Sequence, residues 1–325
     1  MLVSLYVASV GFVHRLSVHL RSAASPCKKK SGWGEMRRYL PFCRACRVRP
    51  ALPAGIGLLC MWAILLPDWG HTQSLFDMRG STQSTGLAHA TTARPGLAGI
   101  HLNPASWAAL TTRTAAVYGG QMYGLPELRH GALTLHWPRG RYVFAAGSST
   151  FGFETYRETY LSAGIARTLS LGPDRALHLG ATTRYYHVQA SRFGSSQAVG
   201  LHLGVIMQVL PLIHVGAHAT NVNQPAWTAD TPLPRTLSVG AAYDLSERVD
   251  LSADLFKDLD FPLRFRTGLE ASVLPLLVLR GGLQTAPSEF ALGLEVRHGP
   301  LHLGIAAEQH WELGWSPAAD VRLLW

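Results

Sequence analysis

Residues 290–310 have the sequence FALGLEVRHGPLHLGIAAEQH, and this stretch decides the fold. Large apolar residues occupy every second position from Phe290 to Val296, and small or polar residues lie between them. Gly299-Pro300 interrupts the pattern, which then resumes from Leu301 to Ile305. Successive side chains of a strand face opposite sides of its sheet, so the stretch predicts a hairpin with one apolar face.

The same alternation recurs along most of the chain, with turn residues such as Pro211 and Pro275 between the repeats. It predicts about 14 strands, each with its turn averaging roughly 15 residues, a length that suits strands of ~9 to 11 residues crossing a bilayer at a tilt. The predicted ranges are 113–123, 128–138, 140–152, 156–171, 175–190, 196–210, 212–222, 235–246, 249–260, 262–274, 276–287, 290–298, 301–311 and 316–325.

Composition indicates which solvent surrounds these strands. Only 15% of the 325 residues are charged, against roughly 25% in soluble domains, whereas the hydrophobic share is 47%. A soluble β-sandwich or propeller, the alternative fold, would carry many charged residues on its outer face, yet Lys257 is the single lysine after residue 73. We therefore predict an all-β protein, a transmembrane antiparallel barrel of about 14 strands with a short amino-terminal plug, in the cell outer membrane.

The net charge of +9 comes from the beginning of the chain. The first 73 residues hold ten of the 29 basic residues and two of the 20 acidic ones, leaving 19 basic and 18 acidic residues for the rest. A nucleic-acid protein needs its basic residues on the folded face that meets phosphate, so no nucleic-acid partner is expected. The apolar run 51–66 follows basic residues, as in a secretory signal.

The predicted divisions of the chain follow from this order. Residues 1–35 are interpreted as an extension from a misassigned start, 36–73 as the signal peptide, 74–111 as the plug, also called a hatch, and 112–325 as the barrel. A retained anchor helix over 51–66 is the alternative to cleavage. All four cysteines lie before residue 61, so the exported chain would contain none, and we expect no metal or cofactor.

A short motif before the first predicted strand resembles a known group of barrels. Asn103-Pro104-Ala105 ends a Gly/Ala-rich segment and precedes Leu110. This arrangement is similar to the amino-terminal plug segment of the FadL and PorV/PorQ group. Further similarities lie at 151–158, 185–187, 219–225, 233–237 and 257–262. The acidic pair usual in that plug is replaced around Arg94 and Pro95, and long extracellular loops are absent from the sequence pattern.

The resemblance implies two functions. Similarity to FadL implies a barrel that passes apolar solutes, with the plug gating its lumen. Similarity to PorV/PorQ implies an accessory barrel of type IX secretion that holds or passes exported proteins. Outer-membrane lipid and the barrel-insertion machinery are expected partners in either case. Apolar solutes are further expected partners in the first case, and secretion-system proteins in the second.

Charged residues recur on the polar face of the predicted strands. Within a wide barrel they would either form ion pairs that brace the wall or provide a polar path for solute. The predicted lumen-facing residues are Glu158, Arg184, Asp250, Asp254, Arg264, Arg266, Glu270, Arg280, Glu295, Arg297 and Glu308.

The chain ends within a predicted strand on an aromatic residue. Val321, Leu323 and Trp325 share one face, an arrangement that resembles the signal read by the barrel-insertion machinery. Aromatic residues near strand ends are typical of the two girdles at the membrane interfaces. The candidates are Tyr118, Tyr123, Trp137, Tyr142, Tyr156, Tyr160, Tyr185, Trp311 and Trp315.

An outer-membrane hydrolase is the remaining alternative, because many histidines and serines occur on the strands. A nucleophile needs a base within hydrogen-bond reach, and that base needs an orienting group. The sequence contains neither a G-x-S-x-G nor an H-E-x-x-H motif. We therefore predict no catalytic residues and a protein that is not an enzyme.

Overall fold

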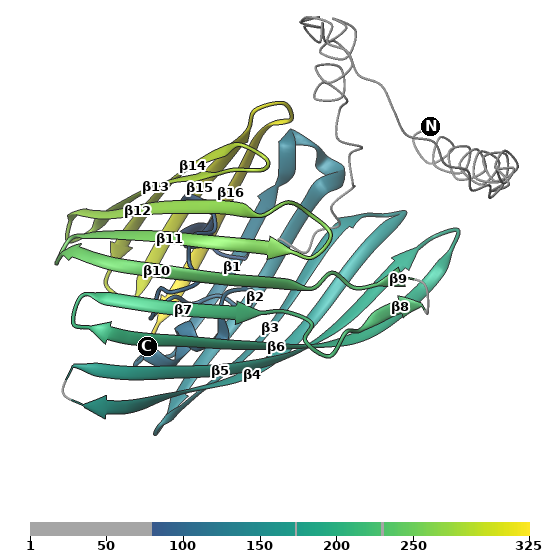
Figure 1. Ribbon diagram of the computed structural model, residues 1–325. Helices are drawn as coiled ribbons and strands as arrows, with labels where there is room; N and C mark the ends of the chain where they lie inside the picture. Colours follow the sequence, from purple (N-terminus) through teal and green to yellow (C-terminus); the bar gives the residue numbers. More distant parts are fainter. Residues whose placement is uncertain (1–79, 173, 229–230) are drawn as a thin grey trace, which may run out of the picture. The chain divides into compact units, whose positions relative to one another are not determined.

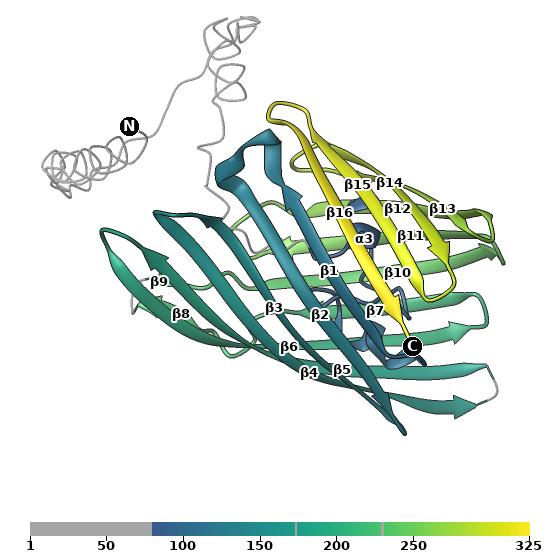
Figure 2. The same cartoon turned by 180° about the vertical axis from the view of Figure 1, so that it is seen from behind.

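The computed structural model describes residues 80–172, 174–228 and 231–325. Fourteen strands of this part form a closed antiparallel barrel, in which each strand pairs with its neighbours in sequence and β1 closes against β16 (Figures 1 and 2). The predicted fold class, with its strand number and plug, is confirmed. The predicted extension, the signal peptide, all four cysteines and the first residues of the plug lie outside the described residues.

The barrel strands follow the predicted ranges closely. They are β1 Thr114–Gln121, β2 Arg129–Arg139, β3 Tyr142–Phe153, β4 Tyr156–Gly172, β5 Arg175–Ala190, β6 Gly194–Leu210, β7 Ile213–Ala219, β10 Thr236–Ser246, β11 Val249–Asp258, β12 Arg264–Leu274, β13 Leu277–Gln284, β14 Glu289–His298, β15 Leu301–His310 and β16 Gly314–Leu324.

Short elements complete the described part. Two lie before the barrel, α3 Thr82–Gly86 and η1 Pro104–Ala109. Two 3-10 turns, η2 Met122–Gly124 and η3 Pro126–Leu128, join β1 to β2, and the pair β8 Ala226–Thr228 and β9 Thr231–Pro232 lies between β7 and β10. The alternation pattern had not predicted this small pair. Within the described residues, no helix is long and apolar enough to cross a membrane.

The two ends of the barrel differ in their connections. At the end where β1 begins and β16 finishes, each of the six turns has two residues, for example Gly140-Arg141 and Pro275-Leu276. At the other end the connections are mostly longer, and the longest covers residues 220–235. Outer-membrane barrels have short periplasmic turns and longer extracellular loops, which makes the short-turn end periplasmic.

The two faces of the wall differ as the alternation predicts. Leu, Val, Ile and aromatic side chains point outward and are exposed on every barrel strand. Gly, Ala, Ser, Thr, His and charged side chains point inward. An apolar outer wall without a free sheet edge is the arrangement a bilayer requires, because closure lets each strand pair its backbone with a neighbour on both sides. The outer-membrane location expected from the sequence follows from this fold and this wall.

The expected aromatic girdle needs one correction. Trp137 and Tyr142 are exposed on the outer wall near the short-turn end, where a girdle residue belongs. Tyr118 and Tyr160 instead point into the barrel and are buried. Tyr118 and Tyr160 occupy inward-facing positions of β1 and β4. Their place near a strand end in the sequence does not show which face of the strand they occupy.

Candidate functional site

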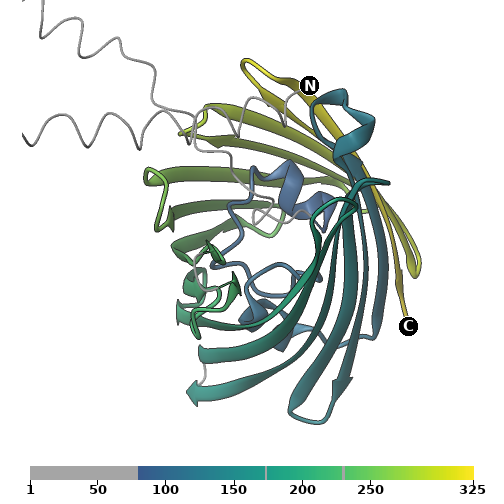
Figure 3. The ribbon, with the colours of Figure 1, turned by 90° about the vertical axis from the view of Figure 1, so that its right-hand side faces the viewer.

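Residues 80–110, called the hatch below, lie inside the barrel between its opposite walls (Figure 3). The short helix α3 contacts β13 to β16, and η1 contacts β3 to β6. Both begin with an N-cap: the Ser81 hydroxyl accepts a hydrogen bond from the Gln83 amide, and Asn103 does the same for Ala105. Every residue of α3 is buried, although its sequence TQSTG is largely polar. The hatch thus fills a polar lumen.

Asn103 connects two parts of the hatch with the wall. Its Oδ1 accepts the 3.0 Å hydrogen bond from the Ala105 amide, which forms an Asn-Pro turn. Its Nδ2 donates to the carbonyl of Thr92 at 2.7 Å, within the hatch, and to the carbonyl of Ala217 on β7 at 3.2 Å. The side chain is 2% exposed. One amide therefore ties the turn to both the preceding hatch segment and the barrel.

Glycines on the inner wall make room for the hatch backbone. A Cβ on Gly204 would collide with Asn103 Oδ1, and one on Gly180 would collide with the Pro104 backbone. On the opposite wall, a Cβ on Gly282 would collide with the backbone of Leu87. The hatch can lie against the barrel because these strand positions carry no side chain.

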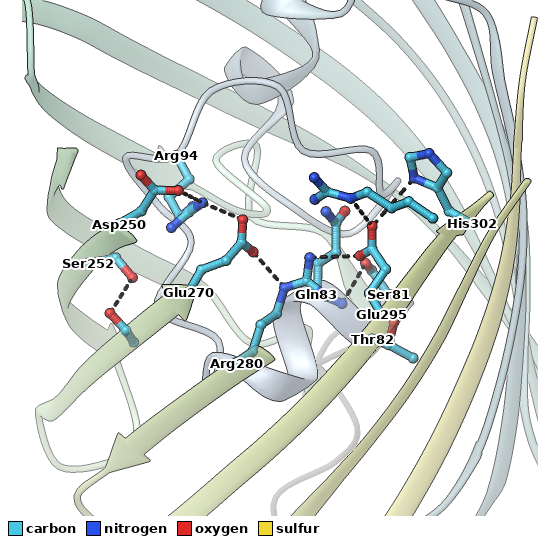
Figure 4. Close-up of polar contacts among 12 residues, drawn as sticks. Ser81, Thr82, Gln83, Arg94, Asp250, Ser252, Glu270, Arg280, Glu295 and His302 are labelled. Atoms are coloured by element: carbon cyan, nitrogen blue, oxygen red, sulfur yellow. Dashed lines mark hydrogen bonds and ion pairs between the residues drawn. The ribbon is translucent and has the colours of Figure 1, made fainter. Parts of the chain in front are cut away.

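An ion-pair chain links the hatch to the wall (Figure 4). Arg94 of the hatch contacts Asp250 at 3.0 Å and Glu270 at 3.1 Å. Glu270 also contacts Arg280 at 2.5 Å, and Arg280 contacts Glu295 at 2.7 Å. The carboxylate of Glu295 in turn accepts from neighbouring arginines, Arg297 at 2.8 Å and Arg322, and lies 3.4 Å from His302. Acids and bases alternate along this chain, so each buried charge has a partner.

Other wall carboxylates hold hatch groups directly. The Thr92 amide donates to Asp254 at 2.9 Å, and the Thr82 amide donates to Asp320 at 2.8 Å. His89 of the hatch lies 2.7 Å from Glu308. A carboxylate is a strong acceptor for a backbone amide, and these contacts satisfy an amide at the start of α3 and one in the irregular part of the hatch.

The eleven residues expected in the lumen all lie on inward-facing positions of the wall. Beyond those named above, Arg184 donates to the Ile100 carbonyl of the hatch at 3.2 Å, and Glu158 accepts from Tyr156. Arg264 and Arg266 lie over the Phe256 ring, at 5.5 and 3.9 Å from its centroid.

The structure adds four residues that the sequence reasoning did not select: His89, Arg94, Asp320 and Arg322. Strand parity would have found the last two, since they alternate with the outward Val321 and Leu323. Arg94 was noted only as a departure from the family pattern. No periodicity applies to an irregular hatch segment, so its partners on the wall could not be inferred.

A small polar cavity of about 70 Å³ lies between the hatch and the wall. Its lining includes His101 and Asn103 from the hatch and His218, Phe256 and Arg266 from the wall. Both ring nitrogens of His101 are buried without a hydrogen-bond partner among the described residues. Burial, with the nearby Arg184 and His130 charges, lowers the pKa of His101 well below its usual value, so the ring is neutral.

An aromatic cluster lies inside the barrel on its long-loop half. Tyr160 and Tyr186 pack edge to face with centroids 5.1 Å apart, and Trp227 packs on Tyr186 at 6.1 Å. Leu233, which follows β9, is buried against both tyrosines. Asn221 holds it there, accepting from the Tyr186 hydroxyl at 2.9 Å and donating to the Pro234 carbonyl at 2.8 Å. Aromatic packing therefore fills this part of the lumen, and Trp227 is its partly exposed member.

The described residues contain no group of three or more His, Cys, Asp or Glu side chains placed to hold a metal ion. The acidic side chains of the lumen instead contact arginines, histidines and backbone amides. This arrangement can hold a hatch reversibly, because each contact is a hydrogen bond or an ion pair and none is covalent.

Comparison with solved structures gives the same fold. The chain is similar to a CymD monoaromatic hydrocarbon channel (12% identity, TM-score 0.53, covering 74% of this chain and 95% of that one). It is also similar to the Pseudomonas putida toluene transporter TodX (12% identity, TM-score 0.54, covering 78% of this chain and 98% of that one). A Pseudomonas aeruginosa FadL homologue is similar as well (10% identity, TM-score 0.50, covering 76% of this chain and 98% of that one). No family model matches the chain, and no curated protein matches it significantly.

Proposed function

We propose that this barrel passes small apolar solutes across the outer membrane and that the hatch gates their passage. The observation that carries this proposal is the hatch itself, a segment of the same chain that fills the lumen and is held by polar contacts. Such contacts break and re-form more readily than an apolar core separates, because water can replace each partner. Similar solved barrels are named as hydrocarbon channels and transporters, which supports an apolar solute.

The aromatic cluster supports the choice of solute. Aromatic faces bind small apolar and aromatic molecules by dispersion and edge-to-face contact. Trp227 presents a partly exposed ring on the long-loop half of the barrel, packed against the fully buried Tyr186 and Tyr160. We assign the first contact of the solute to Trp227, and its further movement to displacement of the hatch.

We assign the structure to the closed state of this gate. The cavity between hatch and wall holds about 70 Å³, and its lining is polar. An apolar cavity that binds benzene in another protein holds roughly 150 Å³. An aromatic solute therefore requires the hatch to move, with Asn103, Pro104 and Ala105 as the turn that anchors it and the lumen charges as its reversible partners.

A reversible cross-link tests the gate directly. Thr92 Oγ1 of the hatch lies 3.0 Å from Ser238 Oγ on β10, and no cysteine occurs after residue 60. Thr92→Cys with Ser238→Cys places two thiols at this contact, and oxidation would lock the hatch to the wall. Thr220→Cys with Thr236→Cys is the matched control, since those hydroxyls lie 2.7 Å apart outside the hatch.

Uptake of toluene into proteoliposomes is the measurement, compared with protein-free vesicles. Oxidation should stop uptake through the hatch pair, reduction should restore it, and the control pair should conduct in both states. Unchanged uptake with a locked hatch would refute gating. Uptake no faster than in protein-free vesicles, for the unmodified barrel, would refute solute transport.

The second candidate is an accessory barrel of type IX secretion, as the PorV/PorQ resemblance suggests. It is favoured by the connections at the long-loop end, most of which have seven residues or fewer and offer little chain for capturing a solute. Affinity purification of the unmodified protein from native membranes decides between the two. Stoichiometric exported cargo or secretion components, together with absent toluene uptake, would favour this candidate.

A further inference from the structure

A groove with an arginine at one end lies on the outer wall of the barrel over β3 to β6. It encloses about 420 Å³, within the size range of small-molecule sites. The backbone of Gly180 and Gly204 contributes to its floor, and Ile165, Leu179 and Leu203 contribute its apolar sides. The same two glycines let Asn103 and Pro104 approach the inner face, so only strand backbone separates the groove from the hatch at these positions.

Arg167 closes the groove toward the short-turn end. Its Nη1 donates to the Tyr142 hydroxyl at 3.2 Å, and its guanidinium carbon lies 5.2 Å from the Tyr142 ring centroid. Its Nε is buried and has no hydrogen-bond partner among the described residues. No carboxylate of residues 80–172, 174–228 or 231–325 lies within ion-pair distance of it. Arg167 thus has a free donor and an uncompensated charge beside an apolar groove.

A second arginine lies in the same row of the wall. Tyr142 pairs with Arg167 on one side and with Arg139 on the other, and the outward parity of β2 makes Arg139 face the same surface. Trp137 and Tyr142 are exposed beside it, where aromatic residues mark the membrane interface. Two cations therefore flank one tyrosine at the level where lipid phosphates lie.

We propose that this groove binds an anionic phospholipid of the periplasmic leaflet, with its phosphate between Arg139 and Arg167 and one acyl chain along the groove. Guanidinium groups bind phosphate by charge-assisted hydrogen bonds, and the Arg167 guanidinium has the Tyr142 hydroxyl but no carboxylate as a partner among the described residues. The apolar sides of the groove run from the interface toward the middle of the wall, which is the direction that a lipid acyl chain takes.

The charge of the site distinguishes a lipid from a second copy of the chain. An arginine on a lipid-facing wall needs an anion beside it, and the row that holds Arg139, Tyr142 and Arg167 continues into Leu179 without a carboxylate. A second copy apposed through this row would bring arginine against arginine. The inference depends on the membrane location of the barrel and is independent of solute transport.

Native mass spectrometry of the full exported chain, released from detergent, tests the site. Phosphatidylglycerol should be retained at one molecule per barrel, and phosphatidylcholine should be retained roughly tenfold more weakly. Arg139→Gln with Arg167→Gln should weaken phosphatidylglycerol roughly tenfold or more. Ala181→Phe, which fills the groove without touching either arginine, should also reduce retention.

Arg157→Gln is the matched control, because Arg157 faces outward on the same strand at the opposite end. It should retain phosphatidylglycerol like the unmodified barrel. A heat-induced shift in gel migration verifies that each variant is folded. The proposal is wrong if the double arginine variant retains phosphatidylglycerol normally, if the two lipids bind equally, or if the groove is occupied by a second copy and the protein is released as a dimer.

Discussion

At the scale of single residues, Asn103 has the contacts that a hatch anchor requires. Asn103→Asp keeps the shape of the side chain and removes the amide that donates to Thr92 and Ala217. In this variant the carbonyls of Thr92 and Ala217 would face a carboxylate oxygen instead of an amide. Losing buried hydrogen bonds in this way costs about 1–3 kcal/mol of the free energy that holds the hatch. We therefore expect the hatch to open more often, measured as faster amide hydrogen exchange over residues 92–107.

Asn223→Asp is the control for that variant. Asn223 also donates to a wall carbonyl, that of Val199 at 2.8 Å, but it is exposed and lies outside the hatch. Exchange over residues 92–107 should then remain unchanged. Equal effects of the two substitutions would contradict a specific role for Asn103.

Gly204→Ala tests the close approach of hatch and wall. The new methyl group would meet Asn103 and Pro104, so the hatch must shift, at a destabilisation of about 1–3 kcal/mol. Toluene uptake should rise if the shifted hatch opens the lumen. Gly119→Ala on β1 is the control, because open space surrounds that position. A hatch as protected from protease in Gly204→Ala as in Gly119→Ala would contradict the predicted collision.

At the scale of elements, the hatch should loosen in acid. The pKa of His101 is lower in the folded hatch than the value of 6.5 for an unperturbed histidine. At a pH between the lowered pKa and 6.5, His101 is protonated in the released hatch and neutral in the hatch bound to the wall. The bound hatch is therefore most stable above about pH 6.5, and its stability decreases as the pH falls below that value. Protease digestion of the hatch at pH 7.5 and pH 5 measures this change.

His101→Gln removes the titrating group and provides the comparison. Its hatch should show a smaller difference in digestion between the two pH values than the unmodified hatch. An identical pH dependence in both proteins would assign the effect to groups other than His101.

The last strand carries a prediction for assembly. Val321, Leu323 and Trp325 all face outward, and the Trp325 backbone pairs with Arg113 next to the β1 to β16 closure. We propose that they form the signal for barrel insertion. Deleting Trp325 should lower the yield of folded barrel in membranes, whereas Leu283→Ala, an outward leucine of an internal strand, should not. Equal yields of heat-modifiable protein would contradict this proposal.

At the scale of the whole molecule, alternation and composition were sufficient for the fold. The strands near 249–260 and 301–311 were placed within a residue or two of β11 and β15. The parity of Arg280 and Glu295 also followed from alternation, since a strand has two faces and only one can meet lipid. The short pair β8–β9 was missed, because three residues are too few to show a period.

The candidate site was predictable only in part. Asn103 was selected from the Asn-Pro-Ala motif, but its bond to Ala217 joins residues 114 positions apart, and no local pattern encodes such a distance. Arg94 looked like a departure from the family pattern, whereas it begins the ion-pair chain to Glu270. A long-range contact depends on which strand lies opposite, and that follows from closure of the barrel.

The sequence by itself determined the barrel, its outward face and the set of residues that point inward, because each depends on local periodicity and on the solvent that meets each face. Only the tertiary structure decided which glycines admit the hatch, which carboxylate holds which amide and that Arg167 borders a groove. These depend on segments far apart in the chain meeting in space, and closing the sheet into a barrel brings them together.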